Sequence, residues 1–347
     1  MDFLKALLIK QKTVISMTLT NYNDFSEKDR WFNRIQIDTE KDFDTIYNIL
    51  RNHKSLCYRA VEEAKYRNYT SIQRSWILQD AKLEKLRENE SIINYDDYVG
   101  SILNRAYTSP DVKQFFAENN IPHNHPVLWA MLQHYGYPTP FLDFSYSIDD
   151  SLFFLIPNAG QLPLPPFQPN NSIDDYFSVY VYNGDVDWFK ASIQNITYNG
   201  AGKVEEMLRV VNFPVDTSDY KAKTDKLDYS DFSQLPFVTV DGPAMGVQQC
   251  AVPVLRFQTS CDMSIPRTSV QDGLFMCIPA VSPVMEEVIV NHTKEKLITC
   301  IDIHKSVRQH IVDNILIPNN INVDSMYMPN DPTTLKIQQI LKKALGF

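Results

Sequence analysis

The chain has 347 residues, of which 44% are hydrophobic and 22% charged, as in a globular protein with one large or two ordinary domains. Its formal net charge of −9 disfavours broad electrostatic binding of nucleic acid or of an anionic membrane. Glycines number 10, and no G-x-G-x-x-G or G-x-x-x-x-G-K-[ST] sequence occurs, which argues against a glycine-rich phosphate loop.

The cysteines and the N-terminus indicate where the protein resides. The five cysteines are odd in number and never form a C-x-x-C pair, which is typical of reduced thiols, so no metal is expected. The opening "MDFLKALLIKQK" is too short and too charged to span a membrane. We therefore expect a cytoplasmic protein that does not bind membranes.

The first part of the chain divides into an extension and the start of a domain. Residues 1–44 are mixed and polar, and we interpret them as an N-terminal extension before one domain over residues 45–347. Apolar residues at helical spacing after Thr39 predict a short amphipathic helix. The run "SLCYRAV" predicts a strand that carries Arg59. Taken alone, Arg59 is best interpreted as an edge-strand residue reaching solvent, because an unpaired buried guanidinium is costly.

Helices follow over residues 72–117. Another helix begins near Pro126 and ends at Gly136, where a left-handed residue is tolerated. Ser147 caps the next helix, over residues 147–156. The stretch "LQHYGYPTPFLDFS", residues 132–145, is therefore predicted as a connector between two helices.

The second half is richer in strands. After the proline-rich residues 162–172, β-branched and aromatic runs predict strands over 176–183, 237–240, 251–259, 273–279 and 296–303. Two helices close the chain. Because helices dominate the first half and strands the second, we expect an α+β fold with an antiparallel-rich sheet, its helices drawn mainly from the N-terminal half and gathered to one side.

Several polar residues have simple structural interpretations. His134 lies at a helix end, where histidine commonly bonds a carbonyl, and without a G-x-S-x-G sequence it does not indicate a serine hydrolase. The adjacent glutamates at 205–206 and 286–287 point in different directions, so we interpret most of them as surface charges.

Taken together, four motifs resemble the FRG domain family over roughly residues 45–345. The first motif is Tyr58-Arg59-Ala60. The second consists of Gln133, His134, Gly136, Pro138, Thr139, Leu142, Asp143, Phe144 and Ser145, and the third, "SIDDSLFFL", matches the helix that follows it in the family. The fourth consists of Arg267, Gln271, Gly273, Leu274 and Phe275. The chain departs from the family pattern at Ala60, where the family has glycine, at Pro140, where it has arginine, and at Phe144, where it has tryptophan.

The resemblance implies a fold similar to ADP-ribosyltransferases, a split sheet or β-sandwich that holds NAD as a substrate. It implies that Arg59 anchors NAD and that Gln271 or Asp272 stands at the catalytic strand, so Arg59, Gln271 and Asp272 are the expected catalytic residues. The expected NAD-binding residues are Arg59, His134, Tyr135, Thr139, Asp143, Phe144, Ser145, Arg267 and Phe275.

The hypothesis that follows is an NAD-dependent ADP-ribosyltransferase-like protein, such as a bacterial toxin or phage-defence effector, that modifies an unidentified macromolecule. No catalytic glutamate is evident: Gln271 is no base, and Asp272 has a shorter reach. Two alternatives stay open. One is a non-catalytic nucleotide-binding or interaction module on the same fold, and the other is an NAD glycohydrolase.

Overall fold

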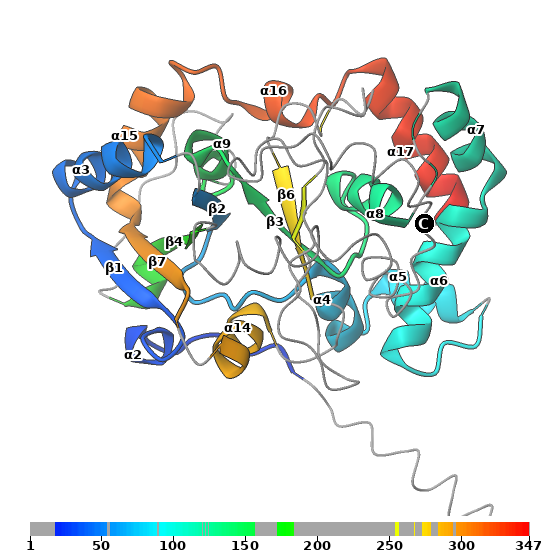
Figure 1. The fold of residues 1–347 in the computed structure, drawn as a ribbon, viewed down its shortest axis with the longest axis horizontal. Coiled ribbons are helices and arrows are strands. Elements are labelled where there is room, and N and C mark those ends of the chain that lie inside the picture. The colour runs from blue at the N-terminus through cyan, green and yellow to red at the C-terminus, as the bar shows by residue number, and fades with distance from the viewer. Residues whose placement is uncertain are drawn as a thin grey trace, which may run out of the picture.

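Seven strands form a single mixed sheet in the order β1-β7-β4-β2-β3-β6-β5 (Figure 1). All neighbouring strands are antiparallel except β1 and β7. The strands are β1 (Asn33–Ile37), β2 (Leu56–Val61), β3 (Phe141–Ser145), β4 (Tyr176–Asn183), β5 (Val254–Arg256), β6 (Gly273–Cys277) and β7 (Ile298–His304). The expected α+β class with an antiparallel-rich sheet is confirmed. The structure is a computed structural model that describes residues 18–53, 56–88, 90–119, 121, 123, 125–156, 172–183, 254–256, 267, 273–278, 284–293 and 296–346.

The sheet is nearly divided between β2 and β3. These two strands pair only at Tyr58 and Ser145, whereas β2 pairs with β4, and β3 with β6, over their full lengths. The sheet therefore consists of a larger part, β1-β7-β4-β2, and a smaller part, β3-β6-β5, that meet at one residue pair. We call this place the β2–β3 junction.

Helices cover both faces of the larger part of the sheet (Figure 1). Helices α2 (Phe25–Lys28) and α14 (Met285–Thr293) lie on one face, and α3 (Glu40–Arg51), α9 (Ile148–Phe153) and α15 (Arg308–Ile311) on the other. The expectation that helices gather to one side is wrong. The physical reason is visible in β4, where Val179 and Val181 face one core and Tyr180 and Tyr182 the other.

The remaining helices form a lobe beside the smaller part of the sheet. Their core includes Phe141 of β3 and Phe275 of β6, so the lobe packs onto that end of the sheet. None of the described helices is both long and apolar enough for a membrane span. The helices are α4 (Ser71–Leu78), α5 (Ala81–Arg87), α6 (Tyr95–Thr108), α7 (Pro110–Glu118), α8 (His125–His134) and α17 (Pro332–Leu345), with α16 (Val323–Tyr327) leading into the last.

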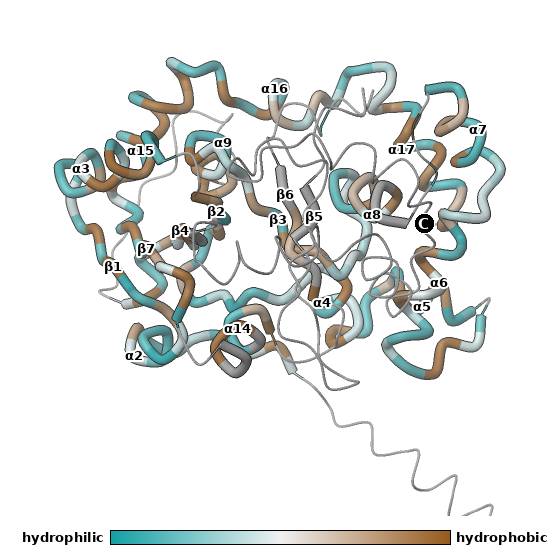
Figure 2. The backbone as a smooth tube through the Cα atoms, in the orientation of Figure 1, coloured by the Kyte–Doolittle hydropathy of each residue, from teal (hydrophilic) through white to brown (hydrophobic). Residues whose placement is uncertain are grey.

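Local signals placed several helix ends correctly. Thr39 caps α3 by accepting a hydrogen bond from the Asp42 backbone, and Ser147 caps α9 in the same way from Asp150. Both α3 and α17 alternate between hydrophobic and hydrophilic residues, as helices packed on one face do (Figure 2).

The stretch 132–145 contains a strand. Its prediction as a helix-to-helix connector is wrong over Phe141–Ser145, where four of the five residues are buried and the backbone pairs with β6. Strand formation here depends on β6, whose paired residues lie 128 to 136 positions later, and no local pattern reveals this pairing. The predicted loop at 162–172, up to residue 171, and the predicted strand at 237–240 lie outside the described residues.

The described part of the N-terminal segment contributes an edge strand and a buried charge. Strand β1 pairs in parallel with β7. The fully buried ammonium of Lys28 donates to the Asp302 carboxylate of β7 and to the Ser178 hydroxyl of β4, at 2.8 Å for the latter. The domain boundary after residue 44 stays a prediction. Both β1 and Lys28 precede this boundary in the sequence and contact the sheet.

Glu286 of α14 is buried and is therefore an exception to the interpretation of most of the adjacent glutamates as surface charges. Its side chain is buried and accepts hydrogen bonds from the Tyr22 hydroxyl at 2.6 Å and from Arg67 Nε at 3.2 Å. Two residues distant in sequence supply these partners, so the adjacent-glutamate pattern alone could not indicate burial. Residues 205–206 lie outside the described residues.

Replacing Lys28 with methionine tests the buried ion pair. We expect Lys28→Met to lower the free energy of unfolding by about 3–5 kcal/mol, because Asp302 would keep a buried charge without its main partner. The matched control is Lys336→Met, which removes an ammonium paired at 3.0 Å with exposed Glu118 and should cost about 0–1 kcal/mol. Urea unfolding measures both, and equal losses would contradict the assignment.

Candidate functional site

Arg59 lies at the β2–β3 junction, on an interior strand. Its Nη1 donates to the Asp143 carbonyl at 3.1 Å and its Nε to the Asn68 side-chain oxygen at 3.0 Å. The interpretation of Arg59 as an edge-strand residue is therefore wrong. Burial lowers the pKa of Arg59, and the Asp143 carboxylate opposes this shift. Arg59 thus supplies a hydrogen bond between two strands that scarcely pair.

Asp143 is oriented by a chain of hydrogen bonds within its own motif. Gln133 Nε2 donates to Asp143 Oδ2 at 2.6 Å, and the buried Thr139 hydroxyl donates to Gln133 Oε1. Because the oxygen and the nitrogen of the Gln133 side-chain amide each have a partner, the side chain is held in one orientation. The glutamine, threonine and aspartate of the motif therefore act together to aim one carboxylate.

Gly136 allows the motif to fold back on itself. Gly136 lies just after the end of α8 and has a φ of +76°, a left-handed conformation that glycine adopts without strain. The Tyr137 amide donates to the Leu132 carbonyl at 3.0 Å. This reversal brings Thr139 back to Gln133 in the last turn of the helix.

A second guanidinium reaches the same neighbourhood from α4. Arg74 is exposed, and its Nη1 donates to the Tyr69 carbonyl at 2.6 Å. Burial lowers the pKa of Arg74, the charge of Arg59 lowers it further, and Asp143 opposes both. Arg59, Arg74 and Asp143 therefore act on one another. Position 140, where the family has arginine, is a buried proline, and Arg74 is the second cation that acts on Asp143.

Burial and the neighbouring groups shift the pKa of Asp143 in opposite directions. Burial raises the pKa of Asp143 although Arg59, Gln133 and Arg74 all lower it. The side chain of Asp143 is exposed, so a ligand can reach it. Within the part of the chain that the structure describes, the charges that act on Asp143 are those of Arg59 and Arg74, two cations in a chain of net charge −9. Among the described residues, no group of three or more His, Cys, Asp or Glu side chains could hold a metal ion.

Arg267 brings Tyr327 of α16 toward this site. Arg267 Nε donates to the Tyr327 carbonyl at 2.7 Å and Nη1 to the His134 carbonyl at 2.9 Å. Its guanidinium carbon lies 4.7 Å from the Tyr135 ring centroid. Burial raises the pKa of Tyr327 and the Asp143 carboxylate raises it further, so the phenol lies within the field of Asp143.

The expected NAD-binding residues fall into two groups. Arg59 and Asp143 are accessible and in direct contact, whereas the others are at most 8% exposed and pack in the structure. Phe275, for example, stacks on Phe141 with ring centroids 5.6 Å apart. Ligand contact by these packed residues stays a prediction: His134, Tyr135, Thr139, Phe144, Ser145, Arg267 and Phe275. Gln271 and Asp272 lie outside the described residues.

Four further residues lie at or near the site, and sequence motifs contain only two of them. Gln133 belongs to the second motif. Tyr327 lies in "INVDSMYMPNDPTTLKIQQI", the tail of the chain, which is also similar to the end of the family sequence. Arg74 and Asn68 belong to no motif, and they approach Arg59 only because the segment before α4 folds across β2.

Comparison with known proteins gives one family match, over part of the chain. The family model described as the FRG domain matches residues 54–161, which include Arg59, Arg74, Gln133 and Asp143. This finding confirms the resemblance over residues 54–161, which hold the first three motifs. No curated protein and no solved structure matches the chain.

Replacing Asp143 with asparagine tests whether its charge is unfavourable to folding. Because its pKa is raised in the folded protein, the stability it contributes is complete below the usual value of 3.8 and is lost as pH rises through the raised pKa. We therefore expect Asp143→Asn to raise the melting temperature at pH 7, with a gain that shrinks toward pH 4.

The matched control is Asp38→Asn. A hydrogen bond from Tyr176 lowers the pKa of Asp38, so its stabilising contribution is present at neutral pH and is lost on acidification. This variant should melt at a lower temperature at pH 7. Thermal unfolding followed by circular dichroism from pH 4 to 8 distinguishes them, and a lower melting temperature in both would contradict the interpretation of Asp143.

Proposed function

We propose that this protein, whose residues 54–161 form an FRG domain, binds NAD at the β2–β3 junction and transfers its ADP-ribose to a macromolecule. The observation that carries the proposal is that Arg59 donates to the Asp143 carbonyl at 3.1 Å, while Arg74, from a separate element, also lowers the pKa of the Asp143 carboxyl. The proposal includes an ADP-ribosyltransferase-like fold, which the narrow junction within the sheet supports.

The two arginines suit the pyrophosphate of NAD. A guanidinium presents five N–H donors in a planar fork that matches phosphate oxygens. The described hydrogen bonds of Arg59 use its Nε and one N–H of Nη1. The remaining donors of Arg59, together with those of Arg74, would bind the two negative charges of the pyrophosphate.

Asp143 suits the chemistry of the adjoining ribose. In ADP-ribosyl transfer the bond between ribose C1′ and the nicotinamide nitrogen breaks, and nicotinamide leaves with the electron pair. The positive charge that develops on the ribose is stabilised by a fixed carboxylate, and the acceptor then bonds to C1′ and loses its proton to a base or to solvent. Asp143 would provide this carboxylate, already aimed by Gln133. Gln271 and Asp272 are proposed to steer the acceptor, as the resemblance implies.

A non-catalytic nucleotide-binding or interaction module is the second candidate. The raised pKa of Asp143 favours it, because a carboxyl that resists ionisation stabilises positive charge less well. An NAD glycohydrolase would differ from the first proposal only in using water as the acceptor.

Incubation of the purified protein and a cell lysate with NAD labelled in its adenylate part tests the proposal. We expect labelled macromolecules and free nicotinamide. Arg59→Ala and Arg74→Ala should each weaken NAD binding about 10- to 100-fold in calorimetry, since each removes a hydrogen bond to a charged group. Arg30→Ala is the control, because it removes the same charge from an exposed residue of another segment.

The outcomes separate the candidates. Nicotinamide release without label transfer indicates a glycohydrolase, and NAD binding without either product indicates a binding module. Absence of NAD binding in the wild type would refute the proposal. A toxin or phage-defence role further requires that expression of the wild type, and not of Arg59→Ala, inhibits growth; equal growth would count against that role.

A further inference from the structure

Both arginines of the candidate site are held by adjacent residues. Arg59 Nε donates to the Asn68 side-chain oxygen at 3.0 Å, and Arg74 Nη1 donates to the Tyr69 carbonyl at 2.6 Å. Asn68 is buried, so its oxygen is held at a fixed place. The position of one short segment therefore sets the position of both guanidinium groups.

The preceding residue, Arg67, extends in another direction, toward α14 and the N-terminal segment. Its Nε donates to Glu286 Oε1 at 3.2 Å, Nη2 to Glu287 Oε1 at 2.5 Å and Nη1 to Thr20 Oγ1 at 3.3 Å. Burial alone lowers the pKa of Arg67, but the two carboxylates outweigh it and raise the pKa overall. All three guanidinium nitrogens of Arg67 are thus engaged, and Glu286 is buried.

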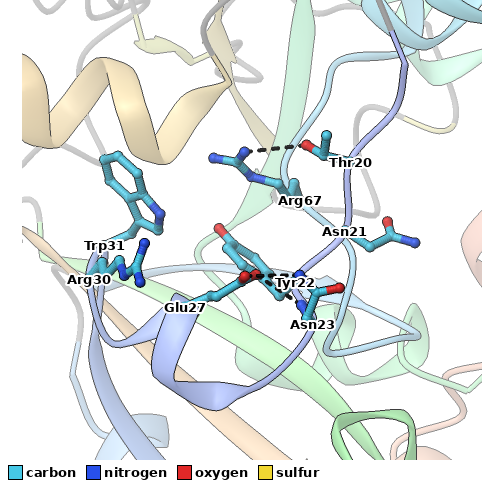
Figure 3. A pocket seen from close by; sticks show the side chains of 8 residues that line it. All are labelled: Thr20, Asn21, Tyr22, Asn23, Glu27, Arg30, Trp31 and Arg67. Atoms are coloured by element: carbon cyan, nitrogen blue, oxygen red, sulfur yellow. Dashed lines mark hydrogen bonds between the residues drawn. The ribbon is translucent and has the colours of Figure 1, made fainter.

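Arg67 also forms part of the wall of a pocket of about 310 Å³ (Figure 3). Figure 3 shows Arg67 and Thr20 pointing toward each other across one side, with Tyr22 and Trp31 beneath and beside the guanidinium. The guanidinium carbon lies 5.4 Å from the Tyr22 ring centroid and 6.0 Å from that of Trp31. The pocket is lined by Thr20, Asn21, Tyr22, Asn23, Glu27, Arg30, Trp31 and Arg67.

The N-terminal segment fixes the same stretch of backbone. The Tyr22 amide donates to the Lys65 carbonyl at 2.8 Å, Asn21 forms a β-bridge with Tyr66, and the Tyr69 hydroxyl lies 2.9 Å from Thr20 Oγ1. Residues 65–69 are therefore held on one side by the N-terminal segment and by α14, and they hold the two arginines on the other.

We propose that Arg67–Tyr69 is a positioning segment that orders Arg59 and Arg74 before an anionic group binds, and that Arg67 is the residue that fixes it. Long arginine side chains lose much conformational freedom when they bind a ligand, so holding them in place beforehand strengthens binding. This inference rests on the anion site of the proposed function. Arg67 acts through Asn68 and Tyr69 and is a positioning residue.

Arg67→Ala in the full chain tests the inference with inorganic pyrophosphate as the probe. We expect the affinity measured by calorimetry to fall about 5- to 150-fold, which corresponds to the ordering of two long side chains. We also expect the NMR signal of the Arg59 Nε–H group, assigned by its loss in Arg59→Lys, to exchange with water faster. Arg67→Lys keeps the charge but loses the planar guanidinium with its several N–H donors, so we expect a smaller loss of pyrophosphate affinity. This variant replaces Arg67→Ala in the test if Arg67→Ala does not fold.

Two controls separate positioning from general stability. Arg30→Ala removes the same charge from the wall of the same pocket, and the charge of Arg30 acts on Asp24 and Glu27 in its own turn. Tyr22→Phe weakens the Glu286 network but leaves the ion pairs of Arg67. Each should lower pyrophosphate affinity less than about twofold and leave the Arg59 signal unchanged, even where the melting temperature falls.

The inference is overturned if the Arg67 variants keep both the affinity and the Arg59 signal, or if only one of the two changes. Absence of pyrophosphate binding by the wild type also overturns it. Failure of NAD turnover is a separate result: if pyrophosphate binds and the Arg67 variants weaken it, the proposed reaction is wrong and the positioning segment stands.

Discussion

The hydrogen bond from Arg59 to the Asp143 carbonyl is the interaction on which the site depends. Strands β2 and β3 pair at one position, and beyond it a side chain takes the place of the backbone ladder. A guanidinium serves this purpose because it donates in several directions at once, here also to Asn68. The junction therefore places a cation between the two parts of the sheet. If β2 and β3 paired along their full lengths, only backbone groups would connect them there.

The charges at this junction are unfavourable to folding, and the surrounding contacts oppose that cost. Burial disfavours the charged forms of Arg59, Arg74 and Asp143 alike. The attraction between Asp143 and each arginine, the Gln133 amide and the Tyr69 carbonyl favour those forms. The buried Lys28–Asp302 pair differs, because both of its members are fully enclosed by the fold. An accessible group of mutually shifted charges is more typical of a functional site than of a structural one.

Sequence reasoning succeeded where the deciding interactions were local and failed where they were distant. The caps at Thr39 and Ser147 lie within three residues of their partners, so pattern alone located them. Strand β3 and the burial of Glu286 depend on partners far along the chain, and both were missed. The motif residues Gln133 and Asp143 were recognised, but their contact required the left-handed turn at Gly136, whose consequence only the structure reveals. Arg74 carried no signal, because its role depends on where α4 begins.

Pro140 shows how a departure from the family pattern fits this arrangement. The residue is buried, and its carbonyl accepts a hydrogen bond from the Ile278 amide at 2.7 Å, extending the contact between β3 and the chain after β6. A proline forms this bond without loss because it needs only its carbonyl. An arginine at this buried position would require its own partners, whereas Arg74 has one in the Tyr69 carbonyl. The second cation of the site thus comes from α4, and its placement depends on the segment that also holds Arg59.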